Sequence, residues 1–464
     1  MSRTKTITAL AALFAVILAA PAIAQQEKAP PQTGTATATA PAKKPAPADP
    51  AALEEMSRQA YEKEKWVSYY GANIKLMNQR PYEPEYMLHI IAACALLERK
   101  DTAYYYMLRM QQQGLSYDLD QNPDTTNIRD TEVYTYLNDL MIQAGQAGGI
   151  VEPVFSLEKE HAGPAAITWD ESRNRFLAGT QSNGAIVAIS DDGNSEVLIQ
   201  ADVGNGLWAI KGLHADAQNN RLWVSSAAIP GFSAFQEADK GRGALFEFDL
   251  KTLELIKRYD VPVDGLLHEP GPITVADSGD VYMLDQGVSR VYRKAGDADR
   301  LEVFIGIPEM TALQDIAVTP DNARLYVSDL WKGVLVVDPA QQSSAMLAVP
   351  ETMNMGRIQS LTYEQGHLVT TQSGFMPERV MQLKLDASGG EILSVSSIAS
   401  AMADFAHPGD ATVRGDQVYY FASPRNDSGN RANEPMTLLR SPLVYENDTR
   451  PADMQKALDE YQPE

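Results

Sequence analysis

Between Ile167 and Tyr420 the sequence repeats one short pattern six times. Each copy has an apolar stretch that predicts a strand, a turn rich in Asp, Asn or Gly, and a second apolar stretch. The copies begin at Ile167, Leu213, Ile273, Ile316, Leu361 and Ala411, which places them 43 to 60 residues apart. Units of about 40–50 residues with four strands each are typical of a β-propeller, in which every unit forms one blade. The sequence therefore predicts six blades.

The two ends of the repeat region indicate how the ring closes. The last copy is followed by one further strand-like stretch, MTLLRSPLVY, and the chain then turns polar. Residues 151–157, VEPVFSL, precede the first copy in the place where a fourth strand precedes the later ones. We expect residues 151–157 to complete the sixth blade, because this would hide a sheet edge that otherwise invites aggregation. The predicted propeller covers residues 151–445.

Residues 51–147 carry apolar residues at three- and four-residue spacing, which predicts helices. The expected helices are Ala51–Glu62, Trp66–Gln79, Pro84–Glu98, Thr102–Gln113 and Thr131–Gln143. The segment resembles tetratricopeptide repeats, because the phrases around Lys65 and Asp101 lie 36 residues apart and Ala103 fits the place where paired helices approach. The resemblance implies a concave groove that engages a peptide or a partner protein. The expected fold class is α plus all-β multidomain: a short tetratricopeptide-like helical array followed by a six-bladed β-propeller.

The tyrosines and the single cysteine of the helical segment each support a separate prediction. Seven tyrosines gather between residues 69 and 106 of this segment: Tyr69, Tyr70, Tyr82, Tyr86, Tyr104, Tyr105 and Tyr106. Most of these rings either fill contacts among the helices and with the propeller, or they form a partner-binding surface. The chain has a single cysteine, Cys94, so an intrachain disulfide is excluded. Cys94 lies in the apolar stretch IIAACALLE. We expect a buried, inert thiol, with a reactive thiol as the alternative.

The N-terminal residues predict that the protein is exported. Residues 1–24 have a basic start, an apolar stretch and the small-residue site Ala22-Ile23-Ala24, which is typical of a secretory signal peptide, with a membrane anchor as the alternative. Residues 25–50 are rich in Pro, Ala and Thr and predict a disordered linker, and residues 446–464 are expected to be a C-terminal tail. The expected location is the periplasm, with no membrane span after signal removal.

The net charge of −22 restricts the classes of partner. Signal removal would take away two basic residues and no acidic ones, making the charge more negative still. Nucleic acids and anionic lipids need clustered Lys and Arg, so this composition argues against both. Basic partner surfaces and cations are favoured instead.

The repeats resemble the senescence-marker-protein, gluconolactonase and luciferin-regenerating-enzyme family of six-bladed propellers. The resemblance covers about 290 residues and rests on phrases such as PAAITWDESRNRFLAG and LQDIAVTPDNARLYVSDLWKGVLVVD. It implies hydrolysis of lactones or related esters by one divalent metal, held by a Glu, an Asn and an Asp just before innermost strands. This sequence has Ala165, Gln314 and Gln359 at those three places. Because a Gln cannot accept a proton at neutral pH, Gln359 cannot replace the family's base.

The candidate ligand-facing residues are polar positions expected at the channel mouth: Lys211, Gln314, Asp315, Gln359 and Asp410. Strand alternation is expected to turn Asp315 and Asp410 away from the direction that their neighbours face. No catalytic residue and no metal ligand is assigned, and no cofactor is expected, although Gln oxygens leave weak Ca²⁺ binding open. His161, His268 and His407 also precede innermost strands, and we expect solvated loop histidines in preference to a converging metal site.

Two loops that join second and third strands are long, Ala227–Arg242 and Ser423–Glu434, and long loops on one face of a rigid scaffold often carry binding. We therefore expect an exported binding or scaffold protein that recognises a small ligand or a protein loop at the channel face, while its helices engage a protein partner. The alternative is a divergent metal-dependent lactonase or esterase, and a third interpretation is a purely structural assembly factor. The absence of the family's metal-binding residues favours a protein that is not an enzyme.

Overall fold

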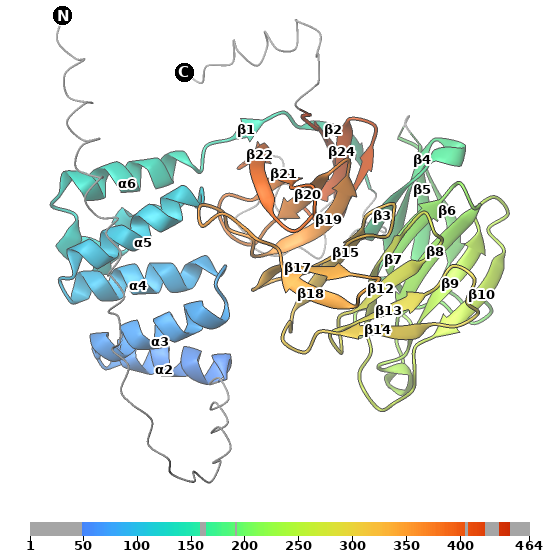
Figure 1. The fold of residues 1–464 in the computed structure, drawn as a ribbon, viewed down its shortest axis with the longest axis horizontal. Coiled ribbons are helices and arrows are strands. Elements are labelled where there is room, and N and C mark those ends of the chain that lie inside the picture. Colours follow the sequence, from blue (N-terminus) through green and yellow to red (C-terminus); the bar gives the residue numbers. More distant parts are fainter. Residues whose placement is uncertain (1–48, 158–163, 191–192, 404–406, 423–435, 446–464) are drawn as a thin grey trace, which may run out of the picture. The chain divides into compact units, whose positions relative to one another are not determined.

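Six antiparallel sheets follow one another along the chain in the computed structural model, which describes residues 49–157, 164–190, 193–403, 407–422 and 436–445 (Figure 1). Blades one to three are β3–β6 (Pro164–Asp170, Arg175–Thr180, Ala185–Ser190, Ser195–Gln200), β7–β10 (Ala209–Asp216, Arg221–Ala227, Gly243–Asp249, Leu255–Asp260) and β11–β14 (Pro270–Val275, Val281–Asp285, Arg290–Lys294, Glu302–Gly306). Blades four and five are β15–β18 (Leu313–Val318, Leu325–Asp329, Gly333–Asp338, Ser343–Met346) and β19–β22 (Ile358–Glu364, His367–Gln372, Arg379–Leu385, Ile392–Ser400). Blade six contains β23–β25 (Ala411–Arg414, Gln417–Ala422, Thr437–Pro442). The prediction of a six-bladed propeller is confirmed.

The sixth blade takes its fourth strand from the beginning of the propeller, as the sequence predicted. β2 (Glu152–Ser156) pairs antiparallel with β25, and Glu152 lies opposite Arg440 in the register. The Arg440 guanidinium also forms an ion pair with Glu152 at 2.6 Å. The chain therefore closes its ring by splicing segments almost 300 residues apart in sequence.

One strand was not predicted. β1 (Gly148–Gly149) adds a fifth strand to the edge of blade five, beside β22. Gly149 has a φ of +95°, and a Cβ there would lie 2.0 Å from the carbonyl oxygen of Ile398. Only glycine fits this approach, so Gly149 allows β1 to pair with β22 where the chain enters the propeller.

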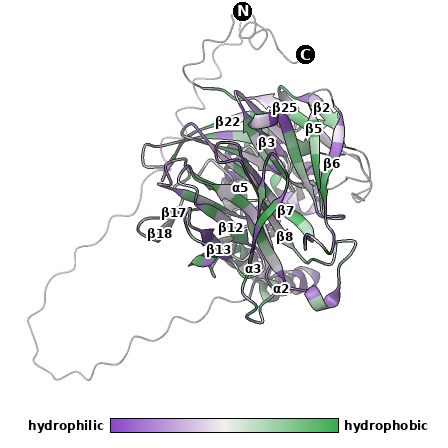
Figure 2. Cartoon of the chain, turned by 90° about the vertical axis from the view of Figure 1, so that its right-hand side faces the viewer, coloured by the Kyte–Doolittle hydropathy of each residue, from purple (hydrophilic) through white to green (hydrophobic). Residues whose placement is uncertain are grey.

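Between each pair of neighbouring blades lies a separate hydrophobic cluster. At the closure seam, Leu157 and Phe176 pack with Phe421, which joins blade six to blade one. Figure 2 shows that β5 is largely hydrophobic. Because each sheet buries both faces against its neighbours, stability depends on an unbroken ring.

Five α-helices precede the propeller in the described part of the chain. They are α2 (Pro50–Glu62), α3 (Trp66–Gln79), α4 (Pro84–Leu96), α5 (Lys100–Gln112) and α6 (Glu132–Gln143). The predicted helices match these to within two residues at each end. Asp49 and Thr131 cap α2 and α6, since their side-chain oxygens accept hydrogen bonds from the amides of Ala51 and Tyr134. No helix among the described residues is both long and apolar enough to span a membrane.

Two short 3₁₀ helices, η2 (Leu119–Gln121) and η3 (Pro123–Ile128), join α5 to α6 and were not predicted. Two others, η5 (Glu171–Arg173) and η6 (Glu237–Asp239), lie in propeller loops, the latter within the long loop that joins β8 to β9. The resemblance of the helices to tetratricopeptide repeats stays a prediction.

Most of the buried apolar residues of the helices form one core. It is built around residues such as Leu76, Met87, Ile90 and Met107, and it includes Cys94. Cys94 is fully buried, and burial raises the pKa of its thiol to about 11, so the prediction of a buried thiol is confirmed. Among the seven tyrosines Tyr105 is 57% exposed, whereas Tyr69, Tyr86 and Tyr106 are buried. Tyr70 and Tyr104 are partly buried against the helical core and Tyr82 against the core between blades four and five, so most of these rings fill internal contacts.

Polar contacts also join the helical segment to blades four and five of the propeller. The Arg357 guanidinium pairs with Glu83 at 2.7 Å, and Asn354 donates to the carbonyl oxygen of Tyr82 at 3.1 Å. Arg379, which is buried, donates to the carbonyl oxygen of Gln113 at 3.2 Å, directly after the last residue of α5. A cation at a helix C-terminus is favoured by the helix dipole, so this contact holds α5 against β21.

Candidate functional site

The innermost strands of all six blades enclose a channel cavity of about 250 Å³. Its charged and titratable lining residues are Lys211, His214, Asp277, Asp315, Tyr363 and Asp410. Three of the five residues predicted from sequence therefore line the cavity: Lys211, Asp315 and Asp410.

A ring of equivalent positions runs around this channel, one residue before the start of each sequence repeat. Its members are Ala166, Gly212, Pro272, Asp315, Ser360 and Asp410. The first three, from blades one to three, are small or apolar, and the last three, from blades four to six, have side-chain oxygens. The ring is therefore polar on one half only.

Each of the three polar ring residues accepts a hydrogen bond from the backbone of the next blade. Asp315 Oδ2 accepts from the amide of Leu361 at 2.6 Å, and Ser360 Oγ accepts from the amide of Ala411 at 3.0 Å. Asp410 Oδ2 accepts from the amide of Ile167 at 2.7 Å, across the seam where blade six meets blade one. These side chains form the ring latches, which couple blades four, five, six and one.

Enclosure by protein makes the two carboxylates of the ring costly to ionise. Burial raises the pKa of Asp410 to about 7. Burial, followed by the negative charge of Asp410, raises the pKa of Asp315 well above its usual range. Ser360 lies between them in the ring and donates to Asp410 Oδ1 at 3.3 Å. The two carboxyl groups thus oppose each other's ionisation, and the latches hold a proton near neutral pH.

The other predicted residues make different contacts. Lys211 Nζ pairs with Glu269 at 2.8 Å, so its charge is neutralised beside the channel. Gln314 and Gln359 are not among the residues that line the cavity. Their Nε2 atoms donate to nearby backbone carbonyl oxygens, those of Ala312 at 3.0 Å and Arg357 at 3.2 Å. Asp315 lines the cavity whereas its neighbour Gln314 does not, so the two side chains face different ways.

The divalent metal implied by the family resemblance does not fit these residues. Two neutral carboxamides that bond the backbone, together with an alanine at position 165, supply no negative charge to a cation. Within the described residues, no group of three or more His, Cys, Asp and Glu side chains is arranged to hold a metal ion.

The expectation of solvated loop histidines is wrong for His268. Its side chain is only 1% exposed, with Nδ1 at 2.6 Å from Asp285 Oδ2 and Nε2 at 2.9 Å from Asp264 Oδ1. Two carboxylates therefore hold the imidazole: Asp264 comes from the same loop before β11, and Asp285 ends β12. His407 lies 2.9 Å from Glu378 and is partly exposed, whereas His161 lies outside the described residues, as does the predicted loop Ser423–Glu434.

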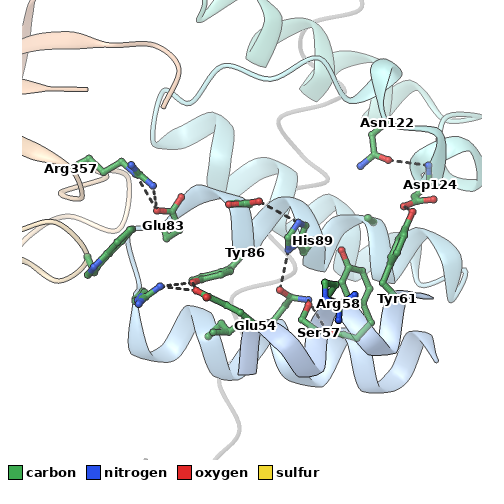
Figure 3. A pocket seen from close by; sticks show the side chains of 17 residues that line it. Glu54, Ser57, Arg58, Tyr61, Glu83, Tyr86, His89, Asn122, Asp124 and Arg357 are labelled. Carbon is green, nitrogen blue, oxygen red and sulfur yellow. Dashed lines mark hydrogen bonds and ion pairs between the residues drawn. The ribbon is translucent and has the colours of Figure 1, made fainter. Parts of the chain in front are cut away.

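The larger cavity, of about 670 Å³, lies along α2, α3 and α4, and we call it the helical groove. Its lining residues are Glu54, Ser57, Arg58, Tyr61, Tyr69, Asn73, Leu76, Arg80, Glu83, Glu85, Tyr86, His89, Ala92, Asn122, Asp124, Trp331 and Arg357. Figure 3 shows Glu83 and Arg357 at one end of this set and Tyr61 and Asp124 at the other. The propeller thus contributes two side chains to a groove made mainly by helices.

The floor of the groove is a chain of buried polar groups. Asn73, which is fully buried, donates from Nδ2 to Ser57 Oγ at 2.8 Å and to the carbonyl oxygen of Tyr69 at 2.9 Å. Its Oδ1 lies 3.2 Å from His89 Nδ1, so the imidazole carries its hydrogen on Nδ1. Burial lowers the pKa of His89, which keeps the ring neutral at neutral pH.

The wall nearest the propeller is an aromatic ring between two guanidinium groups. The Arg80 and Arg357 guanidinium carbons lie 4.5 Å and 5.1 Å from the centre of the Trp331 ring. Arg80 also pairs with Glu54 at 2.7 Å, as Arg357 does with Glu83. These ion pairs and cation–π contacts fix the wall in one arrangement.

At the other end Tyr61 presents an aromatic face to the groove. Its ring contacts those of Trp66 and Tyr69 edge-on, with centroids 5.6 Å and 5.2 Å apart, and its hydroxyl donates to Asp124 at 2.9 Å. Tyr61 remains 40% exposed. The groove therefore offers rigid aromatic surface beside fixed polar groups, which is the composition of sites that bind polypeptides.

Comparison with known proteins does not assign this chain to a family. No protein-family model matches this chain, and no curated protein matches its sequence. A solved structure of a nidogen/laminin complex aligns over 52% of this chain and 81% of its own, with a TM-score of 0.39 and 13% identity. A chain described as a putative oxidoreductase (glucose dehydrogenase), from Thermus thermophilus, aligns over 63% of this chain and 100% of its own, with a TM-score of 0.42 and 13% identity. The six-bladed fold of this protein rests on its own strand pairing.

Proposed function

We propose that this protein is an exported binding protein whose helical groove holds an extended segment of a partner polypeptide. The observation that carries the proposal is the groove itself, a cavity of about 670 Å³ lined by four aromatic rings and a fixed set of polar side chains. Ligand sites in proteins usually have volumes of roughly 300–1,000 Å³. The propeller serves as the rigid support that sets the wall at Trp331 and Arg357.

The groove is preferred to the channel face as the binding site because of what the channel residues do. Asp315 and Asp410 accept backbone hydrogen bonds that join neighbouring blades. Lys211 is paired with Glu269. These groups are engaged in holding the ring together, whereas Tyr61 and Trp331 offer surface to a ligand. Export is inferred from the signal-like residues 1–24, and the helical groove is the partner-engaging surface expected from the helices.

Selection from a random nonapeptide display library against the mature chain tests this function. We expect selected peptides to lose most of their affinity for the double variant Tyr61→Ala/Trp331→Ala, which removes an aromatic face from each end of the groove. The matched control is Tyr105→Ala/Tyr136→Ala, since these rings are 57% and 60% exposed and do not line the groove. Equal binding to the wild type and the groove variant, with both folded by circular dichroism, would reject the proposal, as would a selection that enriches no peptide.

A further inference from the structure

The basic residues of the helical groove are already neutralised within the protein. Three guanidinium groups line it, and each forms an ion pair with one or two glutamates. The pairs are Arg58 with Glu55 and Glu62, Arg80 with Glu54, and Arg357 with Glu83. The groove therefore presents no unpaired guanidinium, in the part of the chain that the structure describes, to attract an acidic ligand.

Two of its acidic residues lack such compensation. Neither Glu85 nor Asp124 forms an ion pair with Lys or Arg among the described residues. The Glu85 side chain is 66% exposed, and its nearest basic group is His89, at 3.8 Å. Because burial lowers the pKa of His89, that ring does not neutralise Glu85 at neutral pH. Asp124 accepts a hydrogen bond from the Tyr61 hydroxyl, and this hydrogen bond raises the pKa of Tyr61.

We propose that the groove is selective for a basic polypeptide segment, with lysine or arginine side chains meeting Asp124 and Glu85. This inference rests on the proposed function. A cation placed at Asp124 would also lie beside the half-exposed ring of Tyr61, where a cation–π contact adds to the Coulomb attraction. The net charge of −22 gives the whole molecule a field that steers basic ligands toward it.

The same nonapeptide library distinguishes this inference from the proposed function. Peptides selected by the wild-type mature chain are expected to be enriched in Lys and Arg relative to the input library. For the tightest synthetic peptide we expect Glu85→Gln/Asp124→Asn to weaken binding by about 5- to 30-fold, the combined effect of two partly exposed ion pairs. The loss should shrink when the salt concentration rises from about 50 to about 500 mM.

The control variant is Glu171→Gln/Glu196→Gln, which removes two exposed charges from blade one and leaves the groove intact. It should change the dissociation constant by less than about twofold. Selected peptides that need Tyr61 and Trp331 but show no basic enrichment would overturn the charge selectivity and leave the groove as a binding site. Basic peptides that lose affinity equally in the blade-one control and the groove variant would show that only the net charge matters. That outcome too would overturn the inference.

Discussion

Replacing Asp410 by Asn should make the protein more stable at alkaline pH. Asp410 belongs to the ring latches and accepts from the amide of Ile167 at 2.7 Å. Asn keeps an oxygen for that amide and carries no charge at any pH. Its amide nitrogen can donate to Ser360 Oγ, which has a second lone pair besides the one used by Ala411. The substitution therefore removes the cost of ionisation and retains the latch.

The sign of the effect follows from the shifted pKa. Burial raises the pKa of Asp410 from 3.8 to about 7, so the folded state binds this proton more tightly than the unfolded state. The free energy of unfolding of the wild type should fall as the pH rises from about 4 to about 7, and the raised pKa of Asp315 acts in the same direction. The rise of about three pH units corresponds to about 4 kcal/mol at most, and we expect ~2–4 kcal/mol at pH 8 because the two carboxyls share the effect.

Urea unfolding of the mature chain at pH 5 and pH 8, followed by tryptophan fluorescence, measures this effect. Asp410→Asn should unfold at higher urea than the wild type at pH 8, and the difference should be less than half as large at pH 5, where little more than one of the three pH units of the shift has been passed. Asp416→Asn, at an exposed turn of the same blade, is the control and should match the wild type at both values. If Asp410→Asn were less stable than the wild type at pH 8, the ionised carboxylate would be the stabilising form and our reasoning would be wrong.

Three further predictions concern closure, the interface and metal binding. Deleting residues 151–157 should cause aggregation or a large fall in melting temperature, because it exposes the edge of β25, whereas deleting residues 25–48 should leave melting unchanged. Glu83→Gln should lower the unfolding free energy by about 2–4 kcal/mol in denaturant titrations, because it leaves the Arg357 guanidinium partly buried without its partner. Elemental analysis and a lactone and ester panel should find no stoichiometric metal and no turnover. A metal whose loss follows Gln314→Ala or Gln359→Ala would instead favour the lactonase alternative.

The elements of both domains could be predicted because their signals are local. Apolar periodicity placed α3 at its observed bounds, and the turn-flanked repeats placed the innermost strands of all six blades. The closure strand β2 was found because it occupies a fixed place relative to the repeats. Period and position in a repeat are thus sufficient for the architecture.

The side-chain interactions that define the two cavities could not be predicted from such signals. That Asp315 bonds the amide of Leu361 depends on how one blade stacks on the next, which strand alternation does not reveal. The wall of the groove needs Trp331 and Arg357, which lie more than 240 residues from the helices they meet. The burial of His268 was not predicted because it depends on contacts with Asp264 and Asp285, which local sequence does not reveal.

Hydrogen exchange of the mature chain, with and without the tightest selected peptide, tests the central claim most directly. We predict that the peptide slows exchange in α2, α3 and α4 and around Trp331 and Arg357, where the helical groove lies. Exchange of the innermost propeller strands should be unaffected. Protection of the loops and strands around the channel, with the helices unchanged, would contradict the assignment of the groove as the binding site.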